Sequence, residues 1–224
     1  KITLMTAKVI LFDFDGTIAD TYQAIANITN QLSSEFGYKA LNSEELLLIK
    51  NLSSREIVKR SEISLFKLPF LVRRVRAELS KEIAELKPIS GIEQILFELK
   101  NQDYILGIVT SNNQENVDIF LRKNNLSHLF RYVYSGTAIF GKHRVINQVI
   151  KEHQINKCEV IYIGDETRDI RSARKSNIPV IAVSWGFNAA EILAEHQPDR
   201  LIDQPRELIQ AIAQLQPCES TVNS

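Results

Sequence analysis

Two carboxylates stand directly behind an apolar run near the start of the chain. Asp13 and Asp15 follow VILF in the stretch VILFDFDGTIAD, residues 9–20. Aspartate is a poor strand former and is rarely buried without a partner. We therefore expect the pair to bind a cation, a proton or a phosphate. In an extended backbone, residues two apart project to the same side, which would place both carboxylates over one site.

Further polar residues adjoin other apolar runs of the chain. They are Thr110, Ser111 and Asn112 after ILGIV, Lys142 at the start of a helical stretch, and Asp165, Glu166 and Asp169 after VIYIG. Ligands of open α/β sheets bind beyond the carboxyl ends of the strands. We therefore expect these residues to gather around Asp13 and Asp15.

These residue types fit phosphoryl transfer assisted by Mg²⁺. The ion prefers oxygen ligands, and Asp13 and Asp165 would each supply a carboxylate from a separate strand. A carboxylate such as that of Asp13 can attack phosphorus and form an aspartyl-phosphate. Asp15 would protonate the leaving oxygen and then deprotonate water.

The charge of the transferred phosphoryl group has to be neutralised by oriented donors and cations. Thr110 offers a hydroxyl, backbone N–H groups around Ser111 and Asn112 lie at an expected helix start, and Lys142 supplies a positive charge. Plainer interpretations exist: Thr110 and Ser111 could be helix caps, and Lys142 a surface lysine. Asp169 could equally pair with a neighbouring arginine.

Short β-branched runs alternate with helical stretches over most of the chain. The expected strands are residues 9–12, 105–110, 132–135, 160–164 and 179–184, and the expected helices are 91–102, 113–125, 142–153 and 169–177. Strands that are apolar on both faces are typical of a parallel sheet covered by helices. The repetition predicts an α/β fold with a doubly wound parallel sheet.

One segment interrupts this alternation. It shows helical patterns at 22–36, 43–50 and 68–86 but no convincing strand, and ELKPISG at 85–91 resembles a return hinge. The predicted domains are an α/β core of residues 1–19 and 88–215, a helical subdomain of residues 20–87, and a frayed tail of residues 216–224. The cluster of Arg73, Arg74 and Arg76 is interpreted as a solvated helix face.

The composition favours a small substrate over a polyanion. Lysine plus arginine and aspartate plus glutamate number 27 each, so the formal net charge is zero and no electrostatic footprint for nucleic acid or membrane is present. No apolar run is long enough to cross a membrane. Cys158 and Cys218 lie far apart without metal-ligand spacing, which favours a reducing compartment and predicts a cytoplasmic protein. The sequence leaves the oligomeric state open.

Four motifs, in order, resemble those of the haloacid dehalogenase superfamily. They are DFDGT at 13–17, IVTSN at 108–112, FGKHRVI at 140–146 and GDETRD at 164–169. With the helical insert they cover nearly the whole chain, and the resemblance is closest to the phosphoglycolate phosphatase-like branch. In that branch the insert is a mobile cap that closes over the site and carries selectivity. True dehalogenases lack the second aspartate of the first motif, so Asp15 favours phosphorus chemistry.

The resemblance implies a role for each core residue. Asp13 would be the nucleophile and a Mg²⁺ ligand, and Asp15 the acid/base, with its backbone carbonyl on the ion. Thr110 and Lys142 would bind phosphoryl oxygens. Asp165 would be the remaining direct ligand and Asp169 a water-mediated one, while the role of Glu166 stays open. In the cap, the resemblance makes Ser53, Ser54 and Arg55 candidate substrate contacts.

The leading hypothesis is a Mg²⁺-dependent phosphatase acting on a small phosphorylated metabolite, either phosphoglycolate-like or a sugar phosphate. A phosphosugar mutase of the same fold would retain the phosphoryl group instead of passing it to water. A non-catalytic phosphate-binding module would be expected to lose Asp13 or Asp15, and both are present. The sequence does not identify the substrate.

Overall fold

The computed structural model of the 224-residue chain describes residues 8–61, 63–136 and 141–215, so the predicted tail lies outside the described residues. Over the described ranges, six parallel strands form one sheet in the order β3-β2-β1-β4-β5-β6. The strands are β1 (Val9–Phe12), β2 (Ile105–Val109), β3 (Phe130–Tyr134), β4 (Val160–Gly164), β5 (Val180–Val183) and β6 (Arg200–Ile202).

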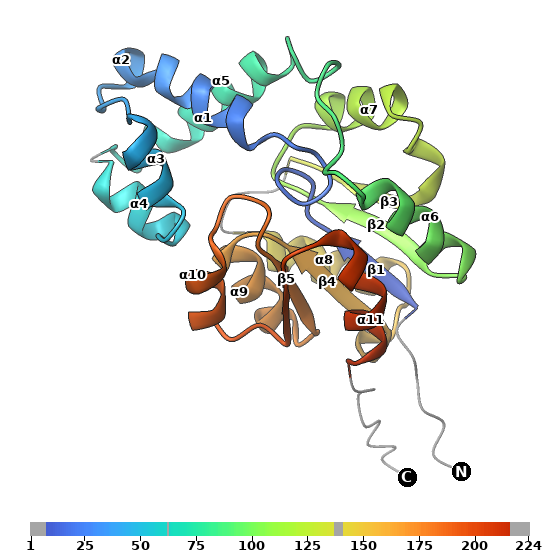
Figure 1. The fold of residues 1–224 in the computed structure, drawn as a ribbon. Coiled ribbons are helices and arrows are strands. Elements are labelled where there is room, and N and C mark those ends of the chain that lie inside the picture. Colours follow the sequence, from blue (N-terminus) through green and yellow to red (C-terminus); the bar gives the residue numbers. More distant parts are fainter. Residues whose placement is uncertain (1–7, 62, 137–140, 216–224) are drawn as a thin grey trace, which may run out of the picture.

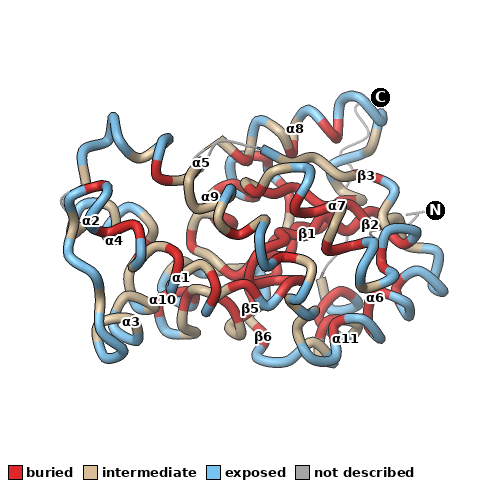
Figure 2. Tube along the Cα trace, turned by 90° about the horizontal axis from the view of Figure 1, so that it is seen from above, coloured by how far each residue is buried: buried red, intermediate tan, exposed pale blue. Residues whose placement is uncertain are grey.

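Hydrophobic cores lie on both faces of the sheet, which explains why its central strands are apolar throughout. Along β1, Ile10 and Phe12 join one core, while Val9 and Leu11 join the other. Successive side chains of a strand point to opposite faces, so a strand covered on both sides needs an unbroken apolar run. Figure 2 shows the buried residues concentrated along the strands.

Helices cover both faces of the sheet (Figure 1), which confirms the predicted doubly wound α/β fold. The core that contains Ile10 receives side chains from the helices α6 (Ile92–Asn101), α7 (Gln114–Lys123) and α11 (Leu208–Ala213). α8 (Lys142–Glu152), α9 (Thr167–Ser176) and α10 (Ala190–Glu195) contribute to the core of Val9. Single 3₁₀ turns at Ser127–Leu129, Lys157–Glu159 and Pro205–Glu207 precede β3, β4 and α11.

The direction of winding reverses beside β1, which lies between β2 and β4. Phe12 is level with Ile108 of β2 and with Ile163 of β4. The pairing continues one residue further, because the N–H of Asp13 donates to Ile163 O at 2.8 Å. The carboxyl ends of three strands therefore meet at one edge, where a reversal of this kind forms a crevice.

The inserted segment forms a layer of short helices next to this edge (Figure 1). They are α1 (Tyr22–Gln31), α2 (Ser33–Phe36), α3 (Ser43–Ile49), α4 (Ser54–Arg60) and α5 (Leu68–Leu79). α1 packs against α5, and Ile28 and Leu71 are buried there. Both residues belong to the same hydrophobic core as Ile10 and Phe12 of β1, so the layer packs continuously onto the sheet.

The chain leaves and re-enters the core at one place. Ala19 forms a β-bridge with Pro88, and the N–H of Asp20 donates to Lys87 O at 3.0 Å. Two adjacent connections of this kind suit a hinge and lie at the predicted limits of the cap, 19/20 and 87/88. The division into domains stays a prediction.

Two features differ from the pattern expected for the strands and helices. The sequence does not predict β6, because three residues show no recognisable alternation and this edge strand owes its place to pairing with β5. The helical pattern at 68–86 ends at Leu79. There the Ser80 hydroxyl donates to Ala77 O and offers the backbone an alternative to the next helical turn.

Two observations concern the predicted cellular location. Among the described residues, none of the helices combines the length and the apolar character needed to span a bilayer. Cys218 lies outside the described residues. The cytoplasmic location stays a prediction.

Candidate active site

Asp13 occupies the first position after β1, in the crevice at the strand ends, and is 1% exposed. The N–H of Phe14 donates to Asp13 Oδ1 at 2.7 Å, and Lys142 Nζ lies 2.7 Å from Oδ2. A backbone donor and a cation thus hold the carboxylate in one orientation. A fixed, buried carboxylate is suited to attack an electrophile delivered to it.

Lys142 is the first residue of α8 and is buried, so its interpretation as a surface lysine is wrong. Its Nζ also lies 2.6 Å from Asp169 Oδ1. Burial by itself lowers the pKa of Lys142, but the charges of Asp13 and Asp169 outweigh that effect and raise the pKa above its ordinary value. The ammonium group therefore stays charged between the two carboxylates.

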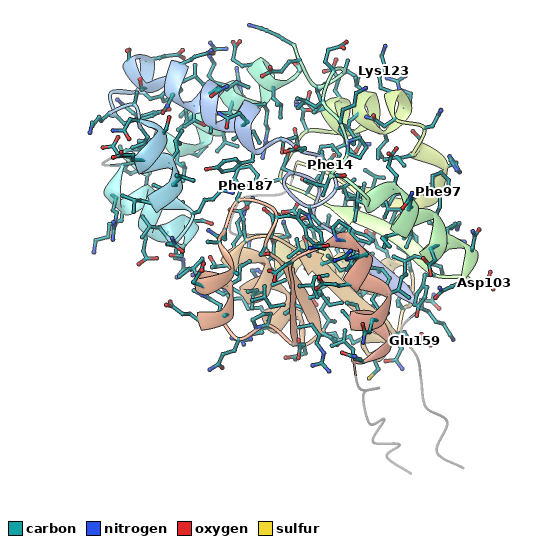
Figure 3. The ribbon with its side chains drawn as sticks, in the orientation of Figure 1. Phe14, Phe97, Asp103, Lys123, Glu159 and Phe187 are labelled. Carbon is teal, nitrogen blue, oxygen red and sulfur yellow. The ribbon has the colours of Figure 1, made fainter. Side chains whose placement is uncertain are left out.

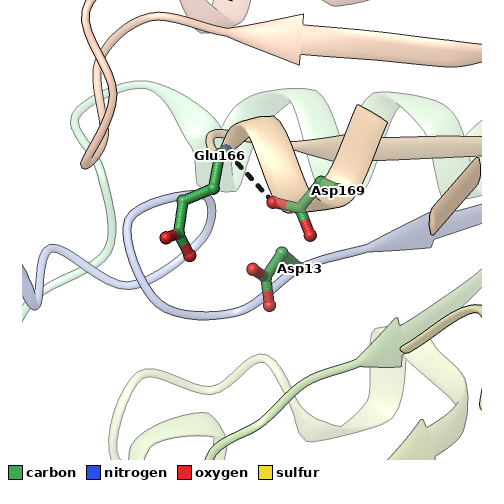
Figure 4. A group of neighbouring side chains, drawn as sticks. All are labelled: Asp13, Glu166 and Asp169. Atoms are coloured by element: carbon green, nitrogen blue, oxygen red, sulfur yellow. Dashed lines mark hydrogen bonds between the residues drawn. The ribbon is translucent and has the colours of Figure 1, made fainter. Parts of the chain in front are cut away.

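Carboxylates from two strand ends form a buried acidic cluster (Figure 4). Asp13, Glu166 and Asp169 each place one oxygen within 4.8 Å of the others. The N–H of Glu166 donates to Asp169 Oδ2 at 3.1 Å, which fixes the turn at the start of α9. Burial raises the pKa of Asp169 to about 6 and the charge of Lys142 opposes it. An all-oxygen cluster of this kind fits a hard divalent cation.

Asp165 lies beside this cluster but points both oxygens at protein donors. The Thr17 hydroxyl donates to Oδ1 at 2.7 Å, and the N–H of Phe187 donates to Oδ2 at 2.7 Å. Burial, followed by the charges of Glu166 and Asp13, raises the pKa of Asp165 well above its ordinary value. Asp165 is thus outside the group that converges within 4.8 Å, and its role as a direct metal ligand stays a prediction.

Glycines make room for Asp165 at two points. A Cβ on Gly16, which has a φ of +73°, would lie 2.5 Å from Asp165 Oδ2, and a Cβ on Gly186 would also overlap this carboxylate. The glycine of the DFDGT motif is therefore required both by its left-handed backbone and by the approach of a carboxylate.

Asp15 faces the opening between the core and the cap. Asn112 Nδ2 donates to both of its carboxylate oxygens, at 3.0 and 3.1 Å. Burial and then the charge of Asp13 raise the pKa of Asp15 to about 7, although the hydrogen bond from Asn112 lowers it. A carboxyl group with a pKa near neutrality can both give and take a proton, as acid/base catalysis requires.

The segment after β2 lies on the other side of Asp15. Thr110 is fully buried, and its hydroxyl accepts the N–H of Asn112 at 3.1 Å. The helix that follows is capped by Asn113, whose side chain accepts the N–H of Asn116 at 2.8 Å. The N-terminal capping residue of helix α7 is therefore Asn113. The alternative interpretation, in which Thr110 or Ser111 caps this helix, is wrong.

A cavity of about 210 Å³ lies between the cap and the core and reaches Asp15. The core contributes Asp15, Ser111, Asn112, Glu166, Arg168 and Phe187, and the cap contributes side chains of α1 and α5. Figure 3 shows Phe187 between the sheet and the cap helices.

The model of the haloacid dehalogenase-like hydrolase family matches residues 10–183. The chain belongs to this family. The match extends from β1 through the inserted helices to β5, so it covers both the crevice and the cap.

Relatives of this haloacid dehalogenase-like hydrolase carry one activity in their names. A phosphoglycolate phosphatase of Synechococcus elongatus is 35% identical over 93% of this chain and 98% of its own. A phosphoglycolate phosphatase of Aliivibrio fischeri is 25% identical over 92% of this chain and 96% of its own. The predicted enzyme class, a hydrolase of phosphoric monoesters, is thereby confirmed.

Solved structures share the fold over almost the whole chain. A haloacid dehalogenase-like hydrolase of Streptococcus pneumoniae has a TM-score of 0.75 and 26% identity, over 91% of this chain and 97% of its own. A protein of Clostridium acetobutylicum described as a predicted phosphatase has a TM-score of 0.80 and 23% identity, over 94% of this chain and 100% of its own. The second likeness concerns the fold alone.

The cap residues singled out from the sequence of this hydrolase are not among those that line the larger cavity. Ser53 caps α4, where it forms a capping box with Glu56. Ser54 donates to Glu166 Oε1 at 3.1 Å, and Arg55 lines a smaller cavity against α8 and α9. The walls of the larger cavity come from α1 and α5 instead.

Several residues of the site were not predicted. Arg76 lines the larger cavity, so the interpretation of its cluster as a solvated face holds for exposed Arg73 but is wrong for Arg76. Its position four residues after Val72 and three before Leu79, which also line the cavity, is the signal that could have identified it. Asn116 and Asn188 are buried polar residues that no motif marks.

Proposed function

We propose that this chain is a Mg²⁺-dependent phosphatase that hydrolyses a small phosphomonoester through an aspartyl-phosphate on Asp13. The observation that carries the proposal is the position of the Asp13 carboxylate. It contacts Lys142 and converges with the carboxylates of Glu166 and Asp169, while Asp15, two residues on, faces the cavity. The relatives named phosphoglycolate phosphatase support a phosphoglycolate-like substrate, with a sugar phosphate as the other member of the proposed class.

In the first half-reaction, an oxygen of Asp13 forms a bond to phosphorus and the bond from phosphorus to the leaving oxygen breaks. Asp15 gives its proton to that oxygen, and the pKa of about 7 allows it to carry this proton near neutral pH. In the second half, Asp15 takes a proton from water, which attacks phosphorus and releases Asp13 and phosphate. Lys142 and the hydroxyl of Thr110 would hold the phosphoryl oxygens.

The residues proposed to hold Mg²⁺ are Asp13, the backbone carbonyl of Asp15, and Asp165, with Asp169 reaching it through water. The acidic cluster adds Glu166 as a candidate, because its oxygen lies within 4.8 Å of those of Asp13 and Asp169. When bound, the ion would neutralise charge on the carboxylates and on the phosphoryl group. We further propose that residues 20–87 act as a cap over the cavity.

The test is hydrolysis of p-nitrophenyl phosphate and of a panel containing phosphoglycolate, sugar phosphates, nucleotides and pyrophosphate, with Mg²⁺. We expect release of phosphate that stops in EDTA and returns on addition of Mg²⁺. Asp13→Asn should lower kcat by about a thousandfold or more, because the amide cannot act as the nucleophile. Asp20→Asn, an exposed aspartate at the start of the cap, is the matched control and should retain wild-type activity.

Two outcomes would contradict the proposal. A wild-type protein that binds but does not hydrolyse any member of the panel with Mg²⁺ would be a phosphate-binding module. Transfer between two positions of a sugar phosphate, with little free phosphate, would identify a mutase.

A further inference from the structure

The larger cavity has an unusual balance of side chains. On the cap side its wall is mostly apolar, with Ile25 from α1 and with Leu71, Val75 and Leu79 among the residues from α5, while Thr29 adds one hydroxyl. One guanidinium, that of Arg76, belongs to the same wall. The catalytic chemistry proposed above uses only core residues, so it gives no function to a cation on the cap side.

Arg76 has a defined position relative to the core. Asn116, fully buried on α7, donates from Nδ2 to Arg76 O at 3.1 Å and to Asn112 Oδ1 at 2.9 Å. Asn112 in turn donates to both oxygens of Asp15. A continuous chain of hydrogen bonds therefore joins the backbone of Arg76 to Asp15, and this holds the backbone of Arg76 at a defined place relative to the reacting end of the site.

Electrostatics agrees with this geometry. Burial lowers the pKa of Arg76, the charge of Asp15 raises it, and the charge of Arg168 lowers it, so the three groups are close enough to influence one another. The Nε of Arg168 donates to Glu166 Oε2 at 2.5 Å within the core. The Arg76 guanidinium lies at the cavity wall, and a guanidinium forms charge-assisted hydrogen bonds with carboxylates.

We propose that Arg76 is a specificity-determining residue that binds a carboxylate of the substrate, at the end remote from the transferred phosphoryl group. The inference rests on the proposed phosphatase function and assigns a residue to the selection of its substrate. A planar guanidinium matches a carboxylate through two parallel hydrogen bonds. A cavity of about 210 Å³ is smaller than typical pockets for drug-sized ligands, so it suits a short phosphorylated carboxylic acid.

The experiment compares two substrates that differ in one group. Phosphoglycolate carries a carboxylate, and 2-hydroxyethyl phosphate carries a neutral hydroxymethyl group in its place. We expect Arg76→Gln to reduce kcat/KM for phosphoglycolate about tenfold to a hundredfold more than for 2-hydroxyethyl phosphate. Arg76→Lys keeps the charge but loses the two parallel N–H donors of the guanidinium. Its kcat/KM for phosphoglycolate should lie between the values for Arg76→Gln and the wild type. The matched control is Arg73→Gln, on the exposed side of the same helix.

Binding gives a readout that does not depend on turnover. Calorimetry compares 3-phosphonopropionate, which has the carboxylate, with propylphosphonate, which lacks it. Arg76→Gln should weaken the affinity for 3-phosphonopropionate by about tenfold or more relative to its effect on propylphosphonate. Equal changes for the two ligands, or no change, would overturn the assignment, and circular dichroism would show whether the variant is folded. A wild type that hydrolyses neither substrate would reject the phosphatase proposal, while the binding comparison would still decide the role of Arg76.

Discussion

Asp15 illustrates how strongly the fold changes the chemistry of a single residue. Its pKa in the folded protein is about 7, chiefly because of burial, against an ordinary value of 3.8. Between these two pH values the folded state keeps a proton that the unfolded state releases. The free energy of unfolding therefore falls as the pH rises through this range, and above pH 7 the full cost of a buried charge is present.

Replacing Asp15 by asparagine should remove this pH dependence. The variant should have nearly the wild-type free energy of unfolding at pH 4 and exceed it by up to about 4 kcal/mol at pH 8, because no charge is then buried. Urea unfolding of the metal-free proteins in EDTA, from pH 4 to pH 8, measures the difference. Asp20→Asn is the control at an exposed aspartate, and a difference for Asp15→Asn that is constant with pH would contradict the raised pKa.

At the scale of elements, the loop after β5 joins the cap to the edge of the core that carries the acidic cluster. Asn188 is 2% exposed and donates from Nδ2 to the carbonyls of Lys50 and Leu52, at 3.2 and 3.0 Å. Its Oδ1 accepts the N–H of Thr167, in the first turn of α9, at 2.9 Å. One side chain thus ties the cap segment before α4 to the helix that carries Asp169.

Asn188→Ala should loosen the cap on the core. The change leaves the buried N–H of Thr167 and the carbonyl of Leu52 without their partner, while Lys50 O keeps the N–H of Ala189; the free energy of unfolding should fall by about 2–3 kcal/mol. Hydrogen exchange followed by mass spectrometry should show faster exchange at residues 50–60 than in β1 and β4. Asn101→Ala, at the exposed end of α6, provides the comparison, and unchanged protection of residues 50–60 would argue against the link.

At the scale of the whole molecule, the charges are balanced overall but concentrated at the candidate site. The formal net charge is zero, so no long-range field draws an anionic substrate toward the protein. The buried carboxylates repel one another, and Lys142 balances only part of their charge. Binding of a divalent cation should therefore relieve repulsion as well as prepare the site, and its effect should extend to global stability.

Mg²⁺ should raise the melting temperature of the wild type. At about a hundred times its dissociation constant, the ion adds about 2.7 kcal/mol, equivalent to roughly 5–10 °C for a chain of this length. Differential scanning calorimetry with and without EDTA measures the shift. Asp13→Asn removes a charge from the proposed ligand set and should reduce the shift, whereas an equal shift in this variant would place the ion elsewhere.

The fold could be predicted because its signals are local. The unbroken apolar runs of β1 and β4 indicate strands buried on both faces, and the spacing of apolar residues in α6 and α8 indicates amphipathic helices. The site was accessible for a related reason, since polar residues directly after such strands lie at one edge of a parallel sheet. As this reasoning predicts, Asp13 and Asp169 lie close enough together for both carboxylates to contact Lys142 Nζ.

The lining of the cavity could not be predicted in the same way. Arg73 and Arg76 belong to one helix and one charge cluster, yet Arg73 is exposed and Arg76 faces the cavity, because the rotation of α5 is set by packing against α1. Likewise, the partner of Ser54 and the cap partners of Asn188 lie more than a hundred residues away, so they are recognisable only after folding. By itself, the sequence determined the order of strands and helices, the family and the acidic motifs. Tertiary structure alone decided which carboxylates converge and which cap side chains face them, since those contacts depend on how separate elements pack.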